Sequence, residues 1–567
     1  MSVSLDEVAK MDYISFKKSN CRNCHKCIRY CPVKSIRFSG NQANVISDEC
    51  ILCGECYVVC PQSAKQIVDE TEIAAVLLHD TTPVYASLAP SFAAYFEGVG
   101  IESMREGLKK LGFADAEETA IGATFVKREY ERIANEATMD VVITSCCSTV
   151  NTLVEKYYPQ LTGCLAPVMT PMQAHCQDLK RRYPGAKTIF IGPCLSKKDE
   201  AARVGVDAAL TFEEIASMLS KKGIELEKKR DNDHNSRARL FPTSGGVLNT
   251  MTNKNPAYDY YCIDGLDNVI PALDDIQRGG ISHCFIEMSA CAGSCVRGPI
   301  MRKQHPSPVR DYQRVATYAG EEDFDIAQPE SSLLANEYHC TLLHKVMPSQ
   351  SELEDILRKM GKITPDDELN CGTCGYNTCR DKAAAIYQGK AEINMCLPYL
   401  MERSERFTDN ILDNTPNGII VVNDSYEIQQ LNRAAMRMLH VHSRSDVMGE
   451  PLIRLMDPID FINASQYGKR IVNKRDYYAE FDIYLELTIV TDKKSGNMIG
   501  IFRDVTDEES ERKSKETLSR QTIETADKVV DKQMRIVQEI ASLLGETAAE
   551  TKIALTKLKE SIANEDE

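Results

Sequence analysis

The sequence predicts a multidomain chain that combines α+β, α/β and helical units. Length and composition require several cores, since the chain has 567 residues, of which 43% are hydrophobic. All 22 cysteines precede residue 400, and most fall into short, regular spacings. The rest of the chain contains no cysteine and ends in one long helical pattern. The chain therefore divides into cysteine-rich units, a cysteine-free unit and a terminal helix.

The net charge of -16 argues against binding to nucleic acid or to an anionic membrane surface. No apolar run reaches the roughly 18 residues of a transmembrane helix, and the first residues lack the basic and apolar regions of a signal peptide. We therefore expect a cytoplasmic protein without nucleic-acid or membrane partners. Clustered cysteines in such a chain indicate metal sites in a reducing or anaerobic cell. Five scattered cysteines are interpreted as small buried hydrophobic residues: Cys164, Cys176, Cys262, Cys284 and Cys340.

The first predicted domain, residues 1–75, contains the motif Cys-x2-Cys-x2-Cys-x3-Cys-Pro twice. This spacing is that of bacterial two-cluster ferredoxins, in which the fourth cysteine of each run binds the other cluster. We expect two 4Fe-4S clusters that conduct electrons, with zinc as the less favoured alternative. The first set of ligands is Cys21, Cys24, Cys27 and Cys60, and the second is Cys50, Cys53, Cys56 and Cys31.

Residues 80–345 are predicted to form an α/β domain. A strand is expected over 82–90 and an amphipathic helix over 101–111, ending at Gly112. Strands over 141–144, 188–192 and 284–290 each lead into a cysteine loop. Because α/β proteins place their sites at the carboxyl edge of parallel sheets, the three loops are expected to converge.

The converging loops offer four thiolates, which is enough for one 4Fe-4S cluster, and one of them could bridge to a second metal centre. A set of buried structural cysteines is the alternative. The four are Cys147, Cys194, Cys291 and Cys295, with Cys146 beside the first.

Over residues 80–345 the sequence resembles the FeFe hydrogenases. Three loops carry the match: Thr144-Ser-Cys-Cys147, Pro193-Cys-x-x-Lys-x-x-Glu200 and Glu287-x-x-Ala-Cys-x-Gly-x-Cys295. The resemblance implies an H-cluster, which is a 4Fe-4S cluster joined through Cys295 to a two-iron subcluster with carbonyl and cyanide ligands. It also implies that Lys197 donates a hydrogen bond to a cyanide and that Cys146 exchanges the proton. A solvated surface lysine is the alternative for Lys197.

Several positions depart from the family pattern. Ser148 replaces a proline, and Gly192 and Ser289 stand where two methionines normally contact the two-iron subcluster. When residues 124–131 are aligned with the family's proton-carrying helix, Arg128 replaces one of two glutamates and Glu131 retains the other. These changes resemble the sensory branch of the family rather than its high-turnover members.

A third cysteine-rich domain is predicted over residues 350–400. A helix is expected to begin at Ser351 and to end at Gly361, and a second helix over 380–393. The pattern resembles a small domain that binds one further 4Fe-4S cluster, and zinc is the alternative. Its ligands would be Cys371, Cys374, Cys379 and Cys396.

Residues 406–507 resemble a PAS domain (α+β) in motif and order. Without cysteine this domain cannot bind a 4Fe-4S cluster, and a haem on His440 or His442 is the less favoured alternative. It is expected to transmit a signal or to dimerise.

Residues 508–567 are predicted to form an amphipathic helix with an acidic, frayed tail at 564–567. The apolar residues from Ile523 to Ile562 keep a 3-4 spacing, which favours a two-stranded coiled coil or docking on a partner over a helix folded back on its own core. The last histidine is His442, so this helix has no phosphorylatable histidine, and the chain is not itself a histidine kinase.

The leading hypothesis is a slow, sensory FeFe hydrogenase. It would react reversibly with H2 and protons, pass electrons through its clusters and signal through its PAS domain and terminal helix. The expected partners are ferredoxin or another electron carrier, maturation proteins, a separate kinase or phosphatase, and a second copy of the chain. The alternatives are a high-turnover ferredoxin-linked hydrogenase and an iron-sulfur scaffold without the two-iron centre.

Overall fold

A computed structural model describes residues 13–229, 231, 236–304, 307–343, 345–468, 470–492 and 496–563. The chain divides into one compact unit that ends at Leu400 and another that begins at Met401. The start of the predicted first domain, residues 1–12, and the predicted acidic tail lie outside the described residues. No helix in the described part of the chain is long and apolar enough to cross a bilayer.

The N-terminal part of the first unit consists of two small pairs of antiparallel strands and two short helices. Strand β1 (Ile14–Phe16) pairs with β4 (Lys65–Ile67), and β2 (Ile36–Ser39) pairs with β3 (Gln42–Val45), both antiparallel. Helices α2 (Lys26–Tyr30) and α3 (Glu55–Val58) each lie between the second and fourth cysteine of one motif. This is the α+β arrangement expected for a two-cluster ferredoxin.

The α/β part contains two parallel sheets, as expected. The four-stranded sheet has the order β6-β5-β8-β9, and the three-stranded sheet has the order β10-β11-β7. Strands β5 (Val84–Leu88), β7 (Val141–Ile143), β8 (Lys187–Gly192) and β11 (Cys284–Ser289) confirm the four predicted strands. The remaining strands are β6 (Asp115–Glu118), β9 (Ala208–Thr211) and β10 (Asp259–Asp264).

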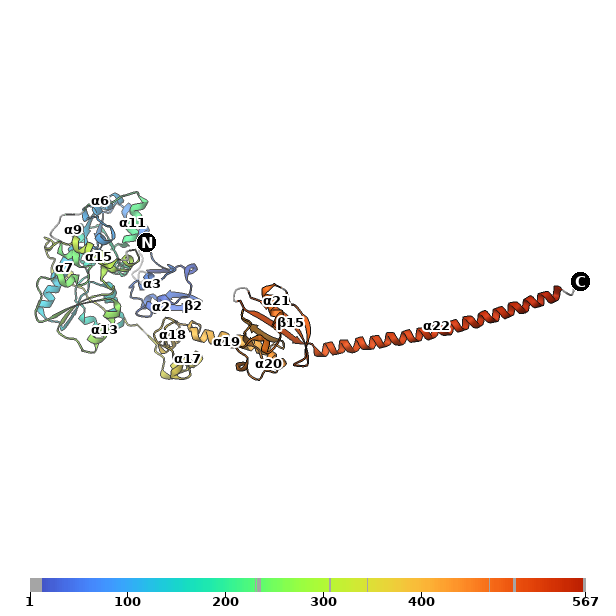
Figure 1. Cartoon of the computed structure of the whole chain (residues 1–567). Coiled ribbons are helices and arrows are strands. Elements are labelled where there is room, and N and C mark those ends of the chain that lie inside the picture. Colours follow the sequence, from blue (N-terminus) through green and yellow to red (C-terminus); the bar gives the residue numbers. More distant parts are fainter. Residues whose placement is uncertain are drawn as a thin grey trace. The chain divides into compact units, whose positions relative to one another are not determined.

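Helices pack around these two sheets (Figure 1). The predicted helix α6 (Ile101–Leu111) is confirmed, and it ends because Gly112 adopts a φ of 117°. The others are α4 (Thr71–His79), α5 (Phe92–Tyr95), α7 (Thr119–Glu136), α8 (Ser148–Tyr157), α9 (Pro171–Arg182), α10 (Ser196–Val204), α11 (Phe212–Lys221), α12 (Gly246–Thr250), α13 (Leu266–Gln277), α14 (Pro299–Gln304), α15 (Pro308–Tyr318) and α16 (Ser331–Leu334).

The last part of the first unit holds α17 (Gln350–Lys359) and α18 (Cys379–Tyr387), and α19 (Leu397–Asn414) follows. Helix α17 begins one residue earlier than predicted because Ser349 caps it and accepts a bond from the backbone of Glu352. The prediction of a helix over 380–393 is wrong at its end. Helix α18 stops at Tyr387 because the chain turns at Gly389, whose φ is 66°.

The second unit contains a five-stranded antiparallel sheet of order β13-β12-β16-β15-β14, the fold expected for a PAS domain. Its strands are β12 (Gly418–Val422), β13 (Ile428–Leu431), β14 (Lys474–Tyr478), β15 (Ile483–Thr491) and β16 (Met498–Asp504), with helices α20 (Arg433–Met438) and α21 (Ile459–Gln466). The predicted terminal helix is α22 (Thr506–Ala563), which leaves the sheet as a single long helix (Figure 1).

Gly54 makes a close contact between the second cysteine motif and α14. Its φ is 74°, and a Cβ there would lie 2.6 Å from Cγ of Pro299. We expect Gly54→Ala to lower the melting temperature, because displacing Pro299 costs about 1–3 kcal/mol. Gly40→Ala is the matched control, since Gly40 has a φ of 57° but nothing within 4 Å of its Cβ. Equal melting temperatures for the two variants by circular dichroism would contradict the importance of this contact.

Candidate cluster-binding site

Three loops bring four cysteines to one buried space in the first unit. Cys147 follows β7 at the start of α8, Cys194 lies between β8 and α10, and Cys291 follows β11. The backbone N–H of Ala290 donates to Sγ of Cys147 at 3.5 Å, so the first and third loops touch. The sequence-predicted convergence is therefore present.

Electrostatics show the same grouping. Burial raises the pKa of Cys291 and of Cys295, and the charges of Cys194 and Cys147 raise both further. Such thiols do not ionise at neutral pH without a cation beside them. The chemistry of this set therefore fits an iron-sulfur cluster, in which iron binds each sulfur as thiolate. Among the described residues, no three His, Cys, Asp or Glu side chains lie close enough to hold a single metal ion.

Cys146 points toward a residue that sequence reasoning missed. The Tyr130 hydroxyl on α7 lies 3.2 Å from Sγ of Cys146 and 2.9 Å from Oγ of Ser145. Burial raises the pKa of Cys146 to about 12, although the Tyr130 bond and the Lys197 charge oppose this. The Cys146 thiol therefore holds its proton at neutral pH.

Lys197 is buried, so the surface-lysine alternative is wrong. Its Nζ lies 2.6 Å from Oε2 of Glu200, whose other oxygen accepts from Thr170. Burial alone would lower the pKa of Lys197, but Glu200 and the thiols of Cys194 and Cys147 raise it above its usual value. The ammonium is therefore charged beside the cysteines.

Glu131 does not join this group. Its Oε1 accepts from the backbone N–H of Thr252 at 2.6 Å and of Asn253 at 3.1 Å, in the turn after α12. Arg128, the other aligned position, donates to the carbonyl of Ile326 at 3.0 Å. A different buried carboxyl, that of Glu287 on β11, raises the pKa of Cys146 beyond the effect of burial. Periodicity could not reveal this, because Glu287 and Cys146 are far apart in the sequence.

The two positions that replace methionines differ in their surroundings. A Cβ on Gly192 would lie 2.6 Å from Cε1 and Cζ of Phe190, so the Phe190 ring fills the space that glycine leaves. The loss of a methionine side chain at Gly192 therefore does not leave open space there. Ser289 ends β11 and is 7% exposed, two residues before Cys291.

The remaining cluster cysteines also gather into groups. Besides burial, the charges of Cys24, Cys60 and Cys21 raise the pKa of Cys27, and those of Cys31, Cys50 and Cys56 raise the pKa of Cys53. These are the two crossed sets predicted for the N-terminal domain. Burial lowers the pKa of Lys382, and the charges of the four cysteines of the third domain oppose this: Cys396, Cys374, Cys379 and Cys371.

The set of Cys31, Cys50, Cys53 and Cys56, here called the central group, lies next to all three other groups. Besides burial, the charge of Cys27 raises the pKa of Cys56, and the charge of Cys53 raises the pKa of Cys291. Burial lowers the pKa of Lys34, whereas the charges of Cys31 and Cys374 raise it. The Lys34 Nζ donates to the carbonyl of Gly375 at 3.1 Å.

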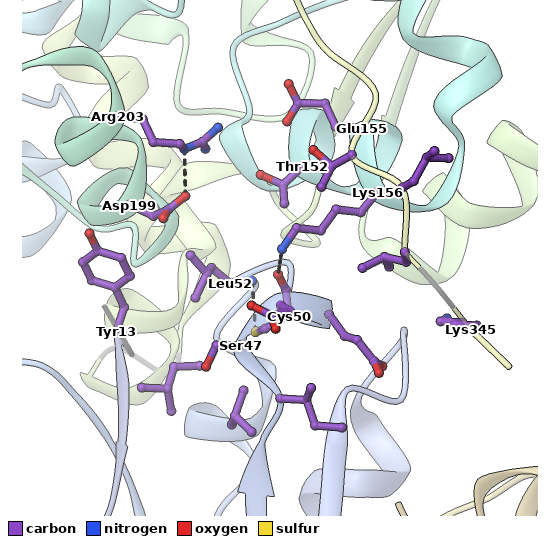
Figure 2. Close-up of a pocket in the computed structure, with 18 residues that line it drawn as sticks. Tyr13, Ser47, Cys50, Leu52, Thr152, Glu155, Lys156, Asp199, Arg203 and Lys345 are labelled. Carbon is purple, nitrogen blue, oxygen red and sulfur yellow. Dashed lines mark hydrogen bonds and ion pairs between the residues drawn. The ribbon is translucent and has the colours of Figure 1, made fainter. Parts of the chain in front are cut away.

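A cleft of ≈ 890 Å³ opens beside the central group (Figure 2). Lys156 Nζ reaches across it to the carbonyl of Cys50 at 2.9 Å, and the backbone N–H of Leu52 donates to Sγ of Cys50 at 3.3 Å. On its far side Arg203 pairs with Asp199 at 3.0 Å (Figure 2). The central group is thus the one that approaches this charged cleft.

The scattered cysteines fit their interpretation only in part. Cys176 and Cys284 are buried as expected, and Cys164 is half-buried. Cys262 and Cys340 are exposed, so the interpretation as buried hydrophobic residues is wrong for these two.

Family models match most of the first unit and the start of the second. Residues 82–299 match "Iron only hydrogenase large subunit, C-terminal domain". Residues 13–61 match "4Fe-4S dicluster domain", residues 367–398 an Fe-S cluster model, and residues 406–476 "PAS fold".

Individual proteins are similar over parts of the chain. The periplasmic Fe hydrogenase large subunit of Nitratidesulfovibrio vulgaris is 28% identical over 395 residues, which cover 55% of this chain and 91% of that protein. Iron hydrogenase 1 of Clostridium pasteurianum is 24% identical, covering 45% and 54%. The cytosolic Fe-S cluster assembly factor NAR1 of Encephalitozoon cuniculi is 25% identical, covering 30% and 56%. The chain thus spans about half the length of the last two.

Solved structures are similar at low identity. A variant of the FeFe-hydrogenase HydA1 from Chlamydomonas reinhardtii has a TM-score of 0.39 at 16% identity and covers 49% of this chain and 100% of that one. The PAS domain of an HTR-like protein from Haloarcula marismortui has a TM-score of 0.15 at 17% identity and covers 18% and 94%. On the family-model matches and the similarity to hydrogenases, this chain is an FeFe-hydrogenase-like protein that also carries 4Fe-4S domains and a PAS domain.

Proposed function

We propose that the chain is a sensory FeFe hydrogenase. It reacts reversibly with H2 at an H-cluster and reports H2 or redox state through its PAS domain and terminal helix. The observation that carries the proposal is the meeting of the three cysteine loops with a buried, charged Lys197 and with Ser289 in place of a methionine. When bound, the H-cluster supplies the metal at which H2 is split or formed.

The residues of the chain have distinct roles in this proposal. Cys147, Cys194, Cys291 and Cys295 would hold the 4Fe-4S part, and Cys295 would also carry the two-iron subcluster. The Lys197 ammonium donates to an anionic ligand of that subcluster, while Glu200 keeps the ammonium in place at 2.6 Å. The Cys146 thiol carries the proton to and from the reacting site, and the Tyr130 hydroxyl, 3.2 Å away, orients it.

The central group would hold the cluster that exchanges electrons with the α/β site, because the charge of Cys53 already acts on Cys291. Two further electron-carrying clusters would be held by Cys21, Cys24, Cys27 and Cys60 and by Cys371, Cys374, Cys379 and Cys396. Ferredoxin or another carrier exchanges electrons with these clusters, and maturation proteins install the two-iron part. Because low-potential clusters need a reducing compartment, we place the protein in the cytoplasm.

The terminal helix supports an output role. Its apolar residues between 529 and 544 cover about half of the helix circumference, which is wider than the seam of a two-stranded coiled coil. All are between 38% and 64% exposed: Val529, Val530, Met534, Ile536, Val537, Ile540, Leu543 and Leu544. The predicted single stripe thus has a second one beside it. In this proposal, α22 of two copies of the chain pair with each other, and helices of a kinase or phosphatase complete a bundle that covers the apolar surface.

A second candidate function is an iron-sulfur scaffold that never receives the two-iron part. The 25% identity to an Fe-S cluster assembly factor favours it. Infrared bands of metal-bound carbonyl and cyanide in the purified, matured protein discriminate the two candidates. A third candidate, a high-turnover hydrogenase, would show the bands together with rapid H2 evolution from reduced ferredoxin.

We expect Cys295→Ala to abolish the carbonyl and cyanide infrared bands, because the bridging thiolate is lost. The N-terminal clusters should remain visible by electron paramagnetic resonance, since their ligands lie in another domain. Cys262→Ala is the matched control, since Cys262 is exposed and outside the four ligands. Bands that survive in Cys295→Ala would overturn the ligand assignment.

Introducing methionine at Ser289 tests the sensory interpretation. Ser289→Met, alone and together with Gly192→Met, should raise H2 turnover toward that of rapid family members. Gly192→Met by itself should mainly lower the melting temperature, because Phe190 already lies 2.6 Å from the new Cβ. Kinetic assays that find turnover unchanged in both Ser289→Met variants would remove the basis for the sensory role.

Ile540→Glu should reduce self-association of the full chain in sedimentation velocity, because a charge enters the centre of the apolar surface. Arg535→Glu is the control, since Arg535 lies on the opposite side of α22. Identical sedimentation of both variants and the unaltered chain would argue against a homodimer through this helix.

A further inference from the structure

A surface cavity lies next to the cysteine loop that follows β11. It has a volume of ≈ 390 Å³ and is lined by Ser244, Cys262, Asp264, Asp267 and Asn268, among others. Cys262 is exposed, so the cavity is open to solvent. Its floor is the end of β10, the edge strand of the three-stranded sheet.

The register of this sheet connects the cavity to the cluster-binding space. Cys262 on β10 is paired with Glu287 on β11, and Asp264 is paired with Ser289. Because alternate residues of a strand point to the same face, these four side chains share one face of the sheet. Two rows of polar side chains therefore lead from the solvent-exposed strand to the buried one.

Hydrogen bonds join the rows to the cysteine loop. Oγ of Ser244 donates to Oδ2 of Asp264, and the backbone N–H of Gly293, between Cys291 and Cys295, donates to the same oxygen at 3.1 Å. Glu287 is 3% exposed, and its Oε2 accepts from the backbone N–H of Leu248 at 3.0 Å. The inner end of the passage is thus the buried carboxyl of Glu287, and the outer end is the half-buried carboxyl of Asp264.

The buried carboxyl is suited to carry protons. Burial raises the pKa of Glu287 to about 7, although the backbone amides of Leu248, Val247 and Gly245 oppose the rise, and the Asp264 charge adds to it. A group with a pKa near neutrality takes up and releases protons with similar ease. The Glu287 charge also adds to the effect of burial in raising the pKa of Cys146. The Glu131 carboxylate instead accepts a hydrogen bond from the turn after α12.

We propose that Glu287, aided by Asp264 and Ser244, passes protons between the surface cavity and the pocket that Cys146 lines. This inference rests on the proposed hydrogenase function. A hydronium ion in the cavity gives its proton to the Glu287 carboxylate and becomes water, so one O–H bond breaks on the ion and one forms on the carboxylate. The new bond breaks in turn as a water molecule in the pocket takes up the proton. The reverse sequence serves H2 oxidation, and no electron or co-reactant is consumed. Ser289 keeps the passage narrow and polar where a methionine would fill it.

Glu287→Gln tests the passage. Glutamine keeps an oxygen for the Leu248 N–H, so a purely structural role would survive and the carbonyl and cyanide bands should persist. Turnover should fall about 100-fold, as expected when a proton carrier is lost. Asp267→Asn is the matched control, because it removes a carboxylate from the same cavity but outside the two rows. Unchanged turnover in Glu287→Gln with intact bands would overturn the proposal.

A second measurement does not depend on the metal. In the full-length, cluster-free protein, infrared difference spectra over about pH 5–9 should contain the C=O band of a buried carboxylic acid that titrates near neutrality. The band should disappear in Glu287→Gln and persist in Asp267→Asn. Its absence from the unaltered protein would overturn the passage, whereas a titrating band in a chain that never shows carbonyl and cyanide bands would refute only the hydrogenase function.

Discussion

The burial of four thiols at the ends of two different parallel sheets is the constraint on which this structure depends. Cys147 and Cys291 follow strands of the three-stranded sheet, and Cys194 follows a strand of the four-stranded sheet. Neither sheet alone could complete the set. Because burial raises the pKa of Cys147, Cys291 and Cys295, these three thiols stay protonated until a cation enters, and cluster insertion must release their protons. The packing of one sheet against the other is thus coupled to the chemistry of the site.

The same constraint explains the contacts around the second cysteine motif. The Tyr157 hydroxyl donates to the carbonyl of Glu49 at 2.7 Å, and Lys390 pairs with the Glu49 side chain at 2.5 Å. Arg302 pairs with Glu55 at 2.6 Å. Three separate segments therefore hold one cysteine loop, which fixes the central group relative to the groups on either side. Electron transfer needs such fixed spacing more than it needs any single strong interaction.

Much of this could be predicted because spacing alone determines it. The repeated Cys-x2-Cys-x2-Cys-x3-Cys motif predicted the crossed cysteine sets, and short apolar runs that end in a turn or a cysteine loop predicted β5, β7, β8 and β11. What could not be predicted depends on side chains brought together from distant segments. Tyr130 is adjacent in sequence to Glu131, yet a rotation of about 100° around α7 sends one to Cys146 and the other to Thr252. Likewise, only the structure shows that Phe190 occupies the space beside Gly192.

The position of the central group has a consequence for damage. The charge of Cys53 raises the pKa of Cys291 in the α/β site, and the charges of Cys31 and of Cys374 in the third domain both raise the pKa of Lys34 against the effect of burial. Under the proposed function, with clusters in all four groups, oxidation of the central cluster would cut the α/β site off from both branches, while every other cluster stayed intact. Such a molecule could still bind H2 but could no longer transfer electrons away from the site. Damage to this one cluster would therefore stop all electron flow through the chain.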